Sequence, residues 1–103
     1  MDLSSEPIRQ DVADTAPLTR REIADLLPGV PGWSLEDRRL VARFACKSFC
    51  DAVAFLQDVA RLSAQESHYP DMSIHRGRTV DVAWYTYAIG GLSRNDFIMA
   101  ARL

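Results

Sequence analysis

His68 and His75 are the only imidazoles of this chain, and imidazole is the side chain best suited to proton transfer near neutral pH. Both lie in residues 66–96, where an apolar-alternating run, an Arg-Gly-Arg turn, an aromatic run and a Gly-Gly pair follow one another. An imidazole can donate a proton to a leaving group or accept one from a ring nitrogen. If the protein performs chemistry, we expect it in this stretch.

Two interpretations of His68, two residues before Pro70, stay open: contact with a ligand, or a structural ring that bonds the backbone at a strand entry. His75 lies within a predicted strand beside an arginine, where we expect it to be exposed and inert. Cys46 and Cys50 lack the further Cys or His ligands that a zinc site requires. We therefore predict two small core or near-surface thiols and no metal.

The chain has 103 residues, enough for one domain with one core. Hydrophobic residues make up 48% and charged residues 25%, as in an ordinary globular protein. A net charge of −2 gives no electrostatic attraction for nucleic acid, and no apolar run is long enough to cross a membrane. The acidic, polar start does not resemble a signal peptide, so we expect a cytoplasmic location.

Three helices are predicted from their starts, where a serine or threonine is followed three residues later by a carboxylate. These starts are Thr19, Ser48 and Ser93. The helix from Ser48 is the longest, because apolar residues recur at helical spacing over about four turns. Residues 1–17 are polar, acidic and without periodicity. We predict a flexible N-terminal arm there, followed by a domain over residues 18–103.

Four strands are predicted as two antiparallel hairpins. Residues 33–35 and 40–46 form the first hairpin, and residues 72–75 and 79–87 form the second. The element order is α-β-β-α-β-β-α. This order predicts an α+β fold in which three helices pack on one face of a four-stranded antiparallel sheet.

A set of short motifs runs in order along the chain from Leu18. They are Leu18-Thr19 with Glu22, Gly32-Trp33, Phe44 with Lys47-Ser48-Phe49, Ala52 with Phe55, Val59-Ala60, His68-x-Pro70, and Gly90-Gly91-Leu92-Ser93-x-x-Asp96. No single motif is specific to one family, but the whole set in this order and at compatible spacing is a strong signal. With this set, the chain resembles the pterin-4a-carbinolamine dehydratases from about residue 18 to its C-terminus. The resemblance implies that family's fold, which has the element order derived above.

In that family the pocket is built around three histidines, two adjacent before the proline and one at the end of the last strand. The resemblance places His68, Tyr69 and Tyr87 at these catalytic positions, so only the first imidazole remains. An acidic and an aromatic residue that are usual in the family are Ala64 and Met72 here. A phenol titrates near ~10 and is a poor proton shuttle at pH 7. Each lost acid–base group typically costs about 10²- to 10⁴-fold in rate, so the resemblance implies impaired catalysis.

We therefore expect a non-catalytic member of the family, most similar to the alpha-carboxysome branch regarded as an assembly factor (chaperone) for Rubisco. The Rubisco large subunit is then the expected protein partner, and the carboxysome an expected location. The alternative is an active dehydratase that eliminates water from 4a-hydroxytetrahydrobiopterin, with His68 as the remaining acid–base group. A third alternative is a paralogue that only dimerises. No cofactor is expected, and a pterin is the one candidate ligand.

Five further residues are predicted to bind a ligand or a partner: Pro70, Asp71, Tyr85, Thr86 and Asp96. Tyr85 and Tyr87 add more aromatic surface than one helix-covered sheet face needs, and aromatic residues are enriched at interfaces. The other sheet face and the strand edges are left uncovered, which favours self-association. The resemblance implies a dimer or tetramer, and we expect a homodimer.

Overall fold

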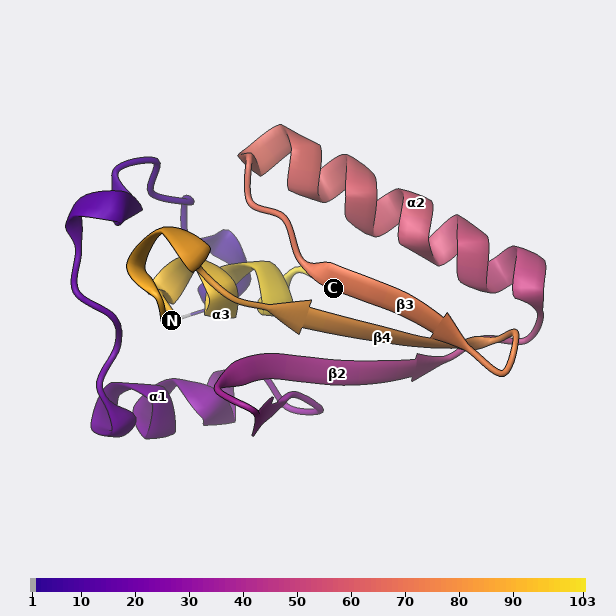
Figure 1. The fold of residues 1–103 in the computed structure, drawn as a ribbon, viewed down its shortest axis with the longest axis horizontal. Helices are drawn as coiled ribbons and strands as arrows, with labels where there is room; N and C mark the ends of the chain where they lie inside the picture. Colours follow the sequence, from indigo (N-terminus) through magenta and orange to yellow (C-terminus); the bar gives the residue numbers. More distant parts are fainter. Residues whose placement is uncertain (1) are drawn as a thin grey trace.

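The computed structural model describes residues 2–103 as three α-helices, four strands and short 3₁₀ turns (Figure 1). The helices are α1 (Arg20–Leu26), α2 (Phe49–Glu66) and α3 (Arg94–Ala101). The strands are β1 (Ser34–Glu36), β2 (Arg39–Ala45), β3 (Asp71–His75) and β4 (Thr79–Trp84). They form one antiparallel sheet in the order β1-β2-β4-β3, so the predicted α+β fold and element order are confirmed.

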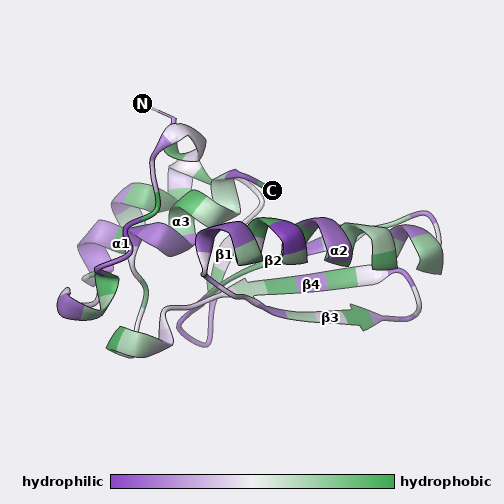
Figure 2. Ribbon diagram, turned by 90° about the horizontal axis from the view of Figure 1, so that it is seen from above, coloured by the Kyte–Doolittle hydropathy of each residue, from purple (hydrophilic) through white to green (hydrophobic). Residues whose placement is uncertain are grey.

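The core lies between the sheet and helices α2 and α3. Val80, Val82 and Trp84 alternate along β4 and are fully buried, because successive side chains of a strand point to opposite faces. Leu40 of β2 pairs with Trp84 and is buried with it. Figure 2 shows α2 lying lengthwise over the strands. Buried side chains of the two helices complete the core: Ala52, Val59, Phe97, Ile98 and Met99.

Both hairpin turns contain residues with positive φ. Asp37 and Arg38, with φ of 50° and 63°, join β1 to β2 as a two-residue loop. Positive φ at both central residues gives the turn a twist that matches that of the flanking strands. Arg76 and Gly77, with φ of 53° and 76°, reverse the chain between β3 and β4. Both turns therefore lie where the sequence predicts them.

Strand β4 ends at Trp84, three residues before the end that the sequence pattern predicts, so that part of the prediction is wrong. Beyond Trp84 the Thr86 N–H donates to the Gly91 oxygen at 3.1 Å, which pulls the chain into a tight loop. A 3₁₀ turn fills the loop, and Gly90 takes a φ of 65°, which glycine adopts without steric cost. Tyr87 consequently sits in this turn rather than in the strand.

All three predicted helix starts are confirmed. Thr19 and Ser93 form capping boxes, and the Ser48 hydroxyl accepts a backbone hydrogen bond in the first turn of α2. At the other end of α2, Ser67 takes a left-handed φ of 53° and turns the chain toward β3. Within residues 2–103, no helix has both the length and the apolar composition needed to span a bilayer.

Residues 2–17 lie against α3 through contacts that the sequence pattern did not predict. Leu3 is buried in the core, and Glu6 accepts two hydrogen bonds from Arg94, at 2.7 and 2.8 Å. Asn95 exchanges two hydrogen bonds with the backbone of Arg9. The predicted flexibility of this arm concerns its motion and stays a prediction, as does the predicted domain boundary after residue 17.

Candidate functional site

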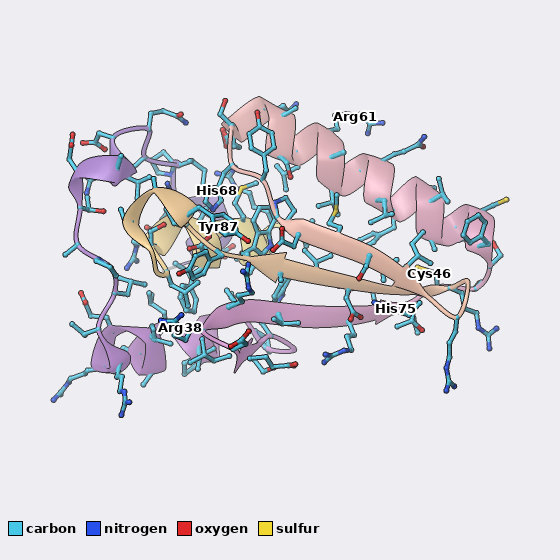
Figure 3. All side chains as sticks on the ribbon, in the orientation of Figure 1. Arg38, Cys46, Arg61, His68, His75 and Tyr87 are labelled. Atoms are coloured by element: carbon cyan, nitrogen blue, oxygen red, sulfur yellow. The ribbon has the colours of Figure 1, made fainter. Side chains whose placement is uncertain are left out.

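A cleft of about 370 Å³ lies where β4 ends and β3 begins, a size typical of ligand sites. The turn after α2 forms one wall and the loop after β4 forms another, and Figure 3 shows His68 and Tyr87 near each other at this place. The lining residues are Val12, Ser67, His68, Tyr69, Pro70, Asp71, Tyr85, Thr86, Tyr87 and Ala88. The cleft thus gathers every predicted site residue except Asp96, which lies behind it.

His68 is held by contacts on several sides. Its backbone N–H donates to the Ser63 oxygen at 3.2 Å. Its ring stacks on the Trp84 indole, with ring centroids 5.6 Å apart and an interplanar angle of 6°. Its Nε2 lies 2.6 Å from Oδ1 of Asp96, and only 11% of the side chain is exposed. The orientation of the ring is therefore set by packing and by one short hydrogen bond.

Asp96 is fully buried, and both of its carboxylate oxygens have partners. Oδ1 faces His68, whereas Oδ2 accepts from the Thr86 hydroxyl at 2.7 Å and from the Ser93 N–H at 2.9 Å. A carboxylate oxygen at this distance accepts, and the matching tautomer of His68 is the one that donates through Nε2. This assignment leaves Nδ1 as the nitrogen that can accept a proton, and no hydrogen bond within residues 2–103 occupies it.

Two of the predicted binding residues, Thr86 and Asp96, have their polar atoms turned toward each other rather than toward the cleft. Thr86 is 3% exposed and Asp96 is 0% exposed. In this geometry, Asp96 acts on a ligand only through His68. Thr86 and Asp96 therefore position the imidazole of His68. The more exposed residues of the cleft are the ones that can contact a ligand directly.

The hydroxyl of Tyr87 is engaged on both sides. It donates to Oδ2 of Asp71 at 2.8 Å and accepts from a guanidinium nitrogen of Arg39 at 2.6 Å. Arg39 also pairs with Asp71 at 2.7 Å. Although 60% of Tyr87 is exposed, its hydroxyl is committed to this triad. The phenol is thus a fixed polar group on the cleft wall.

Arg39 is a site residue that sequence reasoning missed. Its guanidinium lies 4.9 Å from the ring centroid of Tyr85 and 5.2 Å from that of Tyr87, within the range of cation–π attraction. The hydrogen bond to the Tyr87 hydroxyl raises the pKa of Arg39 above its ordinary value. The local sequence pattern carries no signal for this contact, which depends on the pairing of β2 with β4. Leu40 opposes Trp84, so continuing the ladder by one residue brings Arg39 opposite Tyr85.

Tyr69 differs from Tyr87 in having no hydrogen-bond partner among the described residues. It is 63% exposed, at the mouth of the cleft. Pro70 follows it on the same wall and leads into β3. The tyrosine offers an aromatic surface and a phenol to whatever occupies the cleft.

Val12 of the N-terminal arm is a second lining residue that the sequence did not indicate. Its segment, the 3₁₀ turn Val12–Asp14, contacts the turn Tyr87–Ile89 after β4. The arm was expected to lie outside the domain, and apolar periodicity gives no signal for a single valine. One wall of the cleft is therefore built by residues distant in the sequence from the rest of the site.

His75 lies at the opposite end of the sheet from His68 (Figure 3). Its side chain is 55% exposed, as predicted, and its Nε2 lies 2.7 Å from the Ser73 hydroxyl and 3.4 Å from Asp81. Within residues 2–103, no three His, Cys, Asp or Glu side chains gather closely enough to hold a metal ion. The titratable side chains that line the cleft are those of His68, Asp71 and the three tyrosines, Tyr69, Tyr85 and Tyr87.

The fold and this cleft define an α+β protein of the pterin-dehydratase type. The family described as "Pterin 4 alpha carbinolamine dehydratase" matches residues 16–103, and the chain belongs to that family. A crystal structure described as a transcriptional coactivator/pterin dehydratase from Brucella melitensis is similar, with a TM-score of 0.75 and 27% sequence identity. That match covers 82% of this chain and 90% of the Brucella chain.

Curated relatives are similar over most of their length. A protein of Xylella fastidiosa named "Putative pterin-4-alpha-carbinolamine dehydratase" is 42% identical over 87 residues, which covers 82% of this chain and 74% of that protein. A protein of the same name from Nitrosomonas eutropha is 38% identical over 103 residues, covering 99% of this chain and 90% of that protein. The second match extends into the N-terminal arm that lies beyond the family region.

Proposed function

We propose that this chain is a non-catalytic binding member of the pterin-dehydratase family. The observation that carries the proposal is the state of Tyr87, whose hydroxyl is bound to Arg39 and Asp71 at a position where the family resemblance implies a catalytic histidine. Tyr69 stands at a second such position and is exposed without a partner among residues 2–103. His68 remains the only imidazole of the cleft. Dehydration needs both a proton donor for the leaving hydroxyl and an acceptor for the ring nitrogen's proton, and one imidazole does not supply both at once.

The specific role that we propose is that of an assembly factor for Rubisco in alpha-carboxysomes. Its support is the resemblance to that branch of the family, together with the altered histidine set. The partner would be the Rubisco large subunit, and the exposed aromatic rim of the cleft, Tyr69 and Tyr87, is the candidate contact surface.

Co-expression with an alpha-carboxysomal Rubisco tests the assembly role. We expect the chain to raise the yield of assembled Rubisco on native gels, and the double variant Tyr69→Ala/Tyr87→Ala to lose that effect. Arg61→Ala, a change at an exposed site on α2, is the matched control and should keep it. An unchanged Rubisco yield with and without the chain contradicts the assembly role.

A dehydratase acting on 4a-hydroxytetrahydrobiopterin is the second candidate function, and the His68–Asp96 pair favours it. Asp96 fixes one imidazole with Nδ1 available, and the relatives carry dehydratase names. In this interpretation, Nδ1 of His68 takes the proton from the ring nitrogen and passes it to the hydroxyl that leaves C4a as water, so the imidazole is neutral again after each turnover. Replacing His68 by Ala then abolishes turnover, whereas a natural protein without turnover excludes this function.

We further propose that the chain forms a homodimer. The sheet face opposite the helices carries ion pairs, among them Arg43–Glu36 and Arg39–Asp71, rather than an apolar patch. The exposed edge strands β1 and β3 are therefore the better candidates for association. Light scattering coupled to size exclusion measures the mass directly, and a monomeric mass at all concentrations contradicts the dimer.

A further inference from the structure

A groove of about 600 Å³ lies beside α1, and it is larger than the cleft of about 370 Å³ at His68. It lies between α1, the β1–β2 hairpin and the segment from Gly90 to Leu92. The loop after β4 thus separates two hollows, with the cleft at its start and the groove at its end. We refer to this second hollow as the α1 groove.

The α1 groove is lined mainly by aliphatic side chains. Six of them form its walls and floor: Pro17, Leu18, Ile23, Leu27, Leu35 and Leu92. Among residues 2–103, no aromatic side chain and no carboxylate lines it. A flat aromatic ligand would find no ring to stack on here, in contrast to the cleft at His68. The lining favours a flexible aliphatic group.

The apolar face of α1 is only partly covered by the rest of the chain. No residue of α1 is buried, although Ile23 and Leu26 pack against the edge of the core. Leu35, across the groove, is 45% exposed. An amphipathic helix normally buries its apolar stripe, so the groove leaves apolar surface that an occupant would remove from water.

Two guanidinium groups, Arg20 and Arg38, also line the α1 groove. Neither has an ion-pair partner among residues 2–103. Arg39 and Arg43, which follow Arg38 on β2, both have one. Figure 3 shows Arg38 beside α1, at the beginning of β2. With no carboxylate in the lining to neutralise them, the two cations are available to an anion from outside.

We propose that the α1 groove binds an aliphatic carboxylate, a small amphiphile whose chain lies on the leucines and Ile23 while its head group pairs with Arg20 and Arg38. The volume is within the range of small-molecule sites. The apolar lining and the two unpaired cations together favour a ligand with both parts. An uncharged chain would not pair with the arginines, and a short anion would not cover the aliphatic surface. The site is separate from the cleft and does not depend on the proposed function.

Isothermal titration of the purified chain with decanoate, below its micelle concentration, tests the site. We expect saturable one-to-one binding, and weaker binding of decanol and of decyltrimethylammonium, because each keeps the tail but lacks the negative charge. Acetate, which keeps the charge without the tail, should not bind. Decanol binding as tightly as decanoate would overturn the proposal.

Paired arginine variants locate the binding. Arg20→Gln/Arg38→Gln should weaken decanoate binding by about tenfold, the effect of losing two partly exposed ion pairs. Arg76→Gln/Arg78→Gln, at the turn on the far end of the sheet and likewise without ion-pair partners among residues 2–103, is the matched control and should bind normally. Equal weakening by both double variants places the anion elsewhere and overturns the proposal.

A third variant separates the groove from unspecific adsorption. Ile23→Asp puts a carboxylate among the aliphatic residues at a half-exposed position and should abolish binding, with folding checked by its melting curve. If the groove is instead filled by a second copy of the chain, the apparent affinity for decanoate falls as protein concentration rises. That outcome also overturns the proposal.

Discussion

His68 and Asp96 meet at 2.6 Å across 28 residues of sequence, and this hydrogen bond ties the cleft to the first turn of α3. The same carboxylate closes the capping box of that helix through Ser93 and accepts from Thr86. One buried group therefore stabilises the helix start and orients the imidazole. Loss of the carboxylate of Asp96 should affect both the helix start and the orientation of the imidazole.

Asp96→Asn should lower the free energy of unfolding by about 1–3 kcal/mol, because an amide cannot accept at both oxygen positions and a buried donor loses its partner. Urea denaturation measures the change. Asp58→Asn on α2 is the control, since Asp58 is 69% exposed and pairs only with exposed Arg61, and it should change stability by less than about 0.5 kcal/mol. Equal costs at the two positions contradict the role given to Asp96.

The hydroxyls of Tyr87 and Tyr69 should differ in their effect on stability. Tyr87→Phe removes two hydrogen bonds at a solvent-exposed site, and we expect a loss of up to about 1 kcal/mol. Tyr69→Phe removes none that the structure shows and should be neutral. Urea denaturation of the two variants measures the difference. A Tyr87→Phe protein as stable as the natural one argues against the hydrogen bonds of Tyr87 with Arg39 and Asp71.

Glu6 gives the N-terminal arm a dependence on pH. Hydrogen bonds from Arg94 hold the pKa of Glu6 below its ordinary value. Because the folded pKa is lower than the unfolded one, the contribution of this ion pair is complete above about pH 4.3, the ordinary pKa of glutamate. It is lost as the pH falls through the folded value. We then expect only a partial release of the arm, because buried Leu3 and the hydrogen bonds between Asn95 and Arg9 still hold it.

Amide chemical shifts of Leu3 and Asn95 followed by NMR through an acid titration report that release. Glu6→Gln should remove the transition, since glutamine does not titrate in this range. A transition that persists unchanged in the Glu6→Gln protein assigns it to another group. The relaxation of the same amides at neutral pH measures whether the arm is already mobile, as the sequence predicts.

Gly91 and Gly90 should respond differently to alanine. A Cβ at Gly91 would lie 2.7 Å from Cβ of Pro17, so Gly91→Ala must displace the segment that leads into α1 and should cost about 1–3 kcal/mol. At Gly90 the space is open, and the cost of about 1–2 kcal/mol comes from its φ of 65° alone. Only Gly91→Ala should also shift the NMR signals of Leu18. An undisturbed Leu18 in that variant contradicts the close contact.

The sequence was informative where structure is decided locally. Thr19, Ser48 and Ser93 begin helices because a side-chain cap depends on residues three positions apart, and the buried side of β4 follows from its alternation. The end of β4 was missed because it depends on a hydrogen bond from Thr86 across the loop to Gly91.

Long-range contacts explain the other omissions. Arg39 joins the site only through the strand order that sets β4 between β2 and β3. Arg9 and Asn95 are 86 residues apart, and nothing in the local pattern of residues 1–17 indicates that they meet. His68 was predicted from its imidazole and Tyr85 from its aromatic surface, whereas the family resemblance placed Tyr69 and Tyr87. The structure shows that seven of the eight predicted site residues line one cleft.

The most direct test of a non-catalytic cleft is a dehydratase assay with 4a-hydroxytetrahydropterin on the natural protein and on a Tyr69→His/Tyr87→His double variant. The two changes supply imidazoles at both missing positions, and the second also releases Arg39 and Asp71 from the phenol. We predict no turnover by the natural protein and a gain of rate by the variant. Turnover by the natural protein at ~1 per second or more, a rate typical of enzymes, would contradict the account.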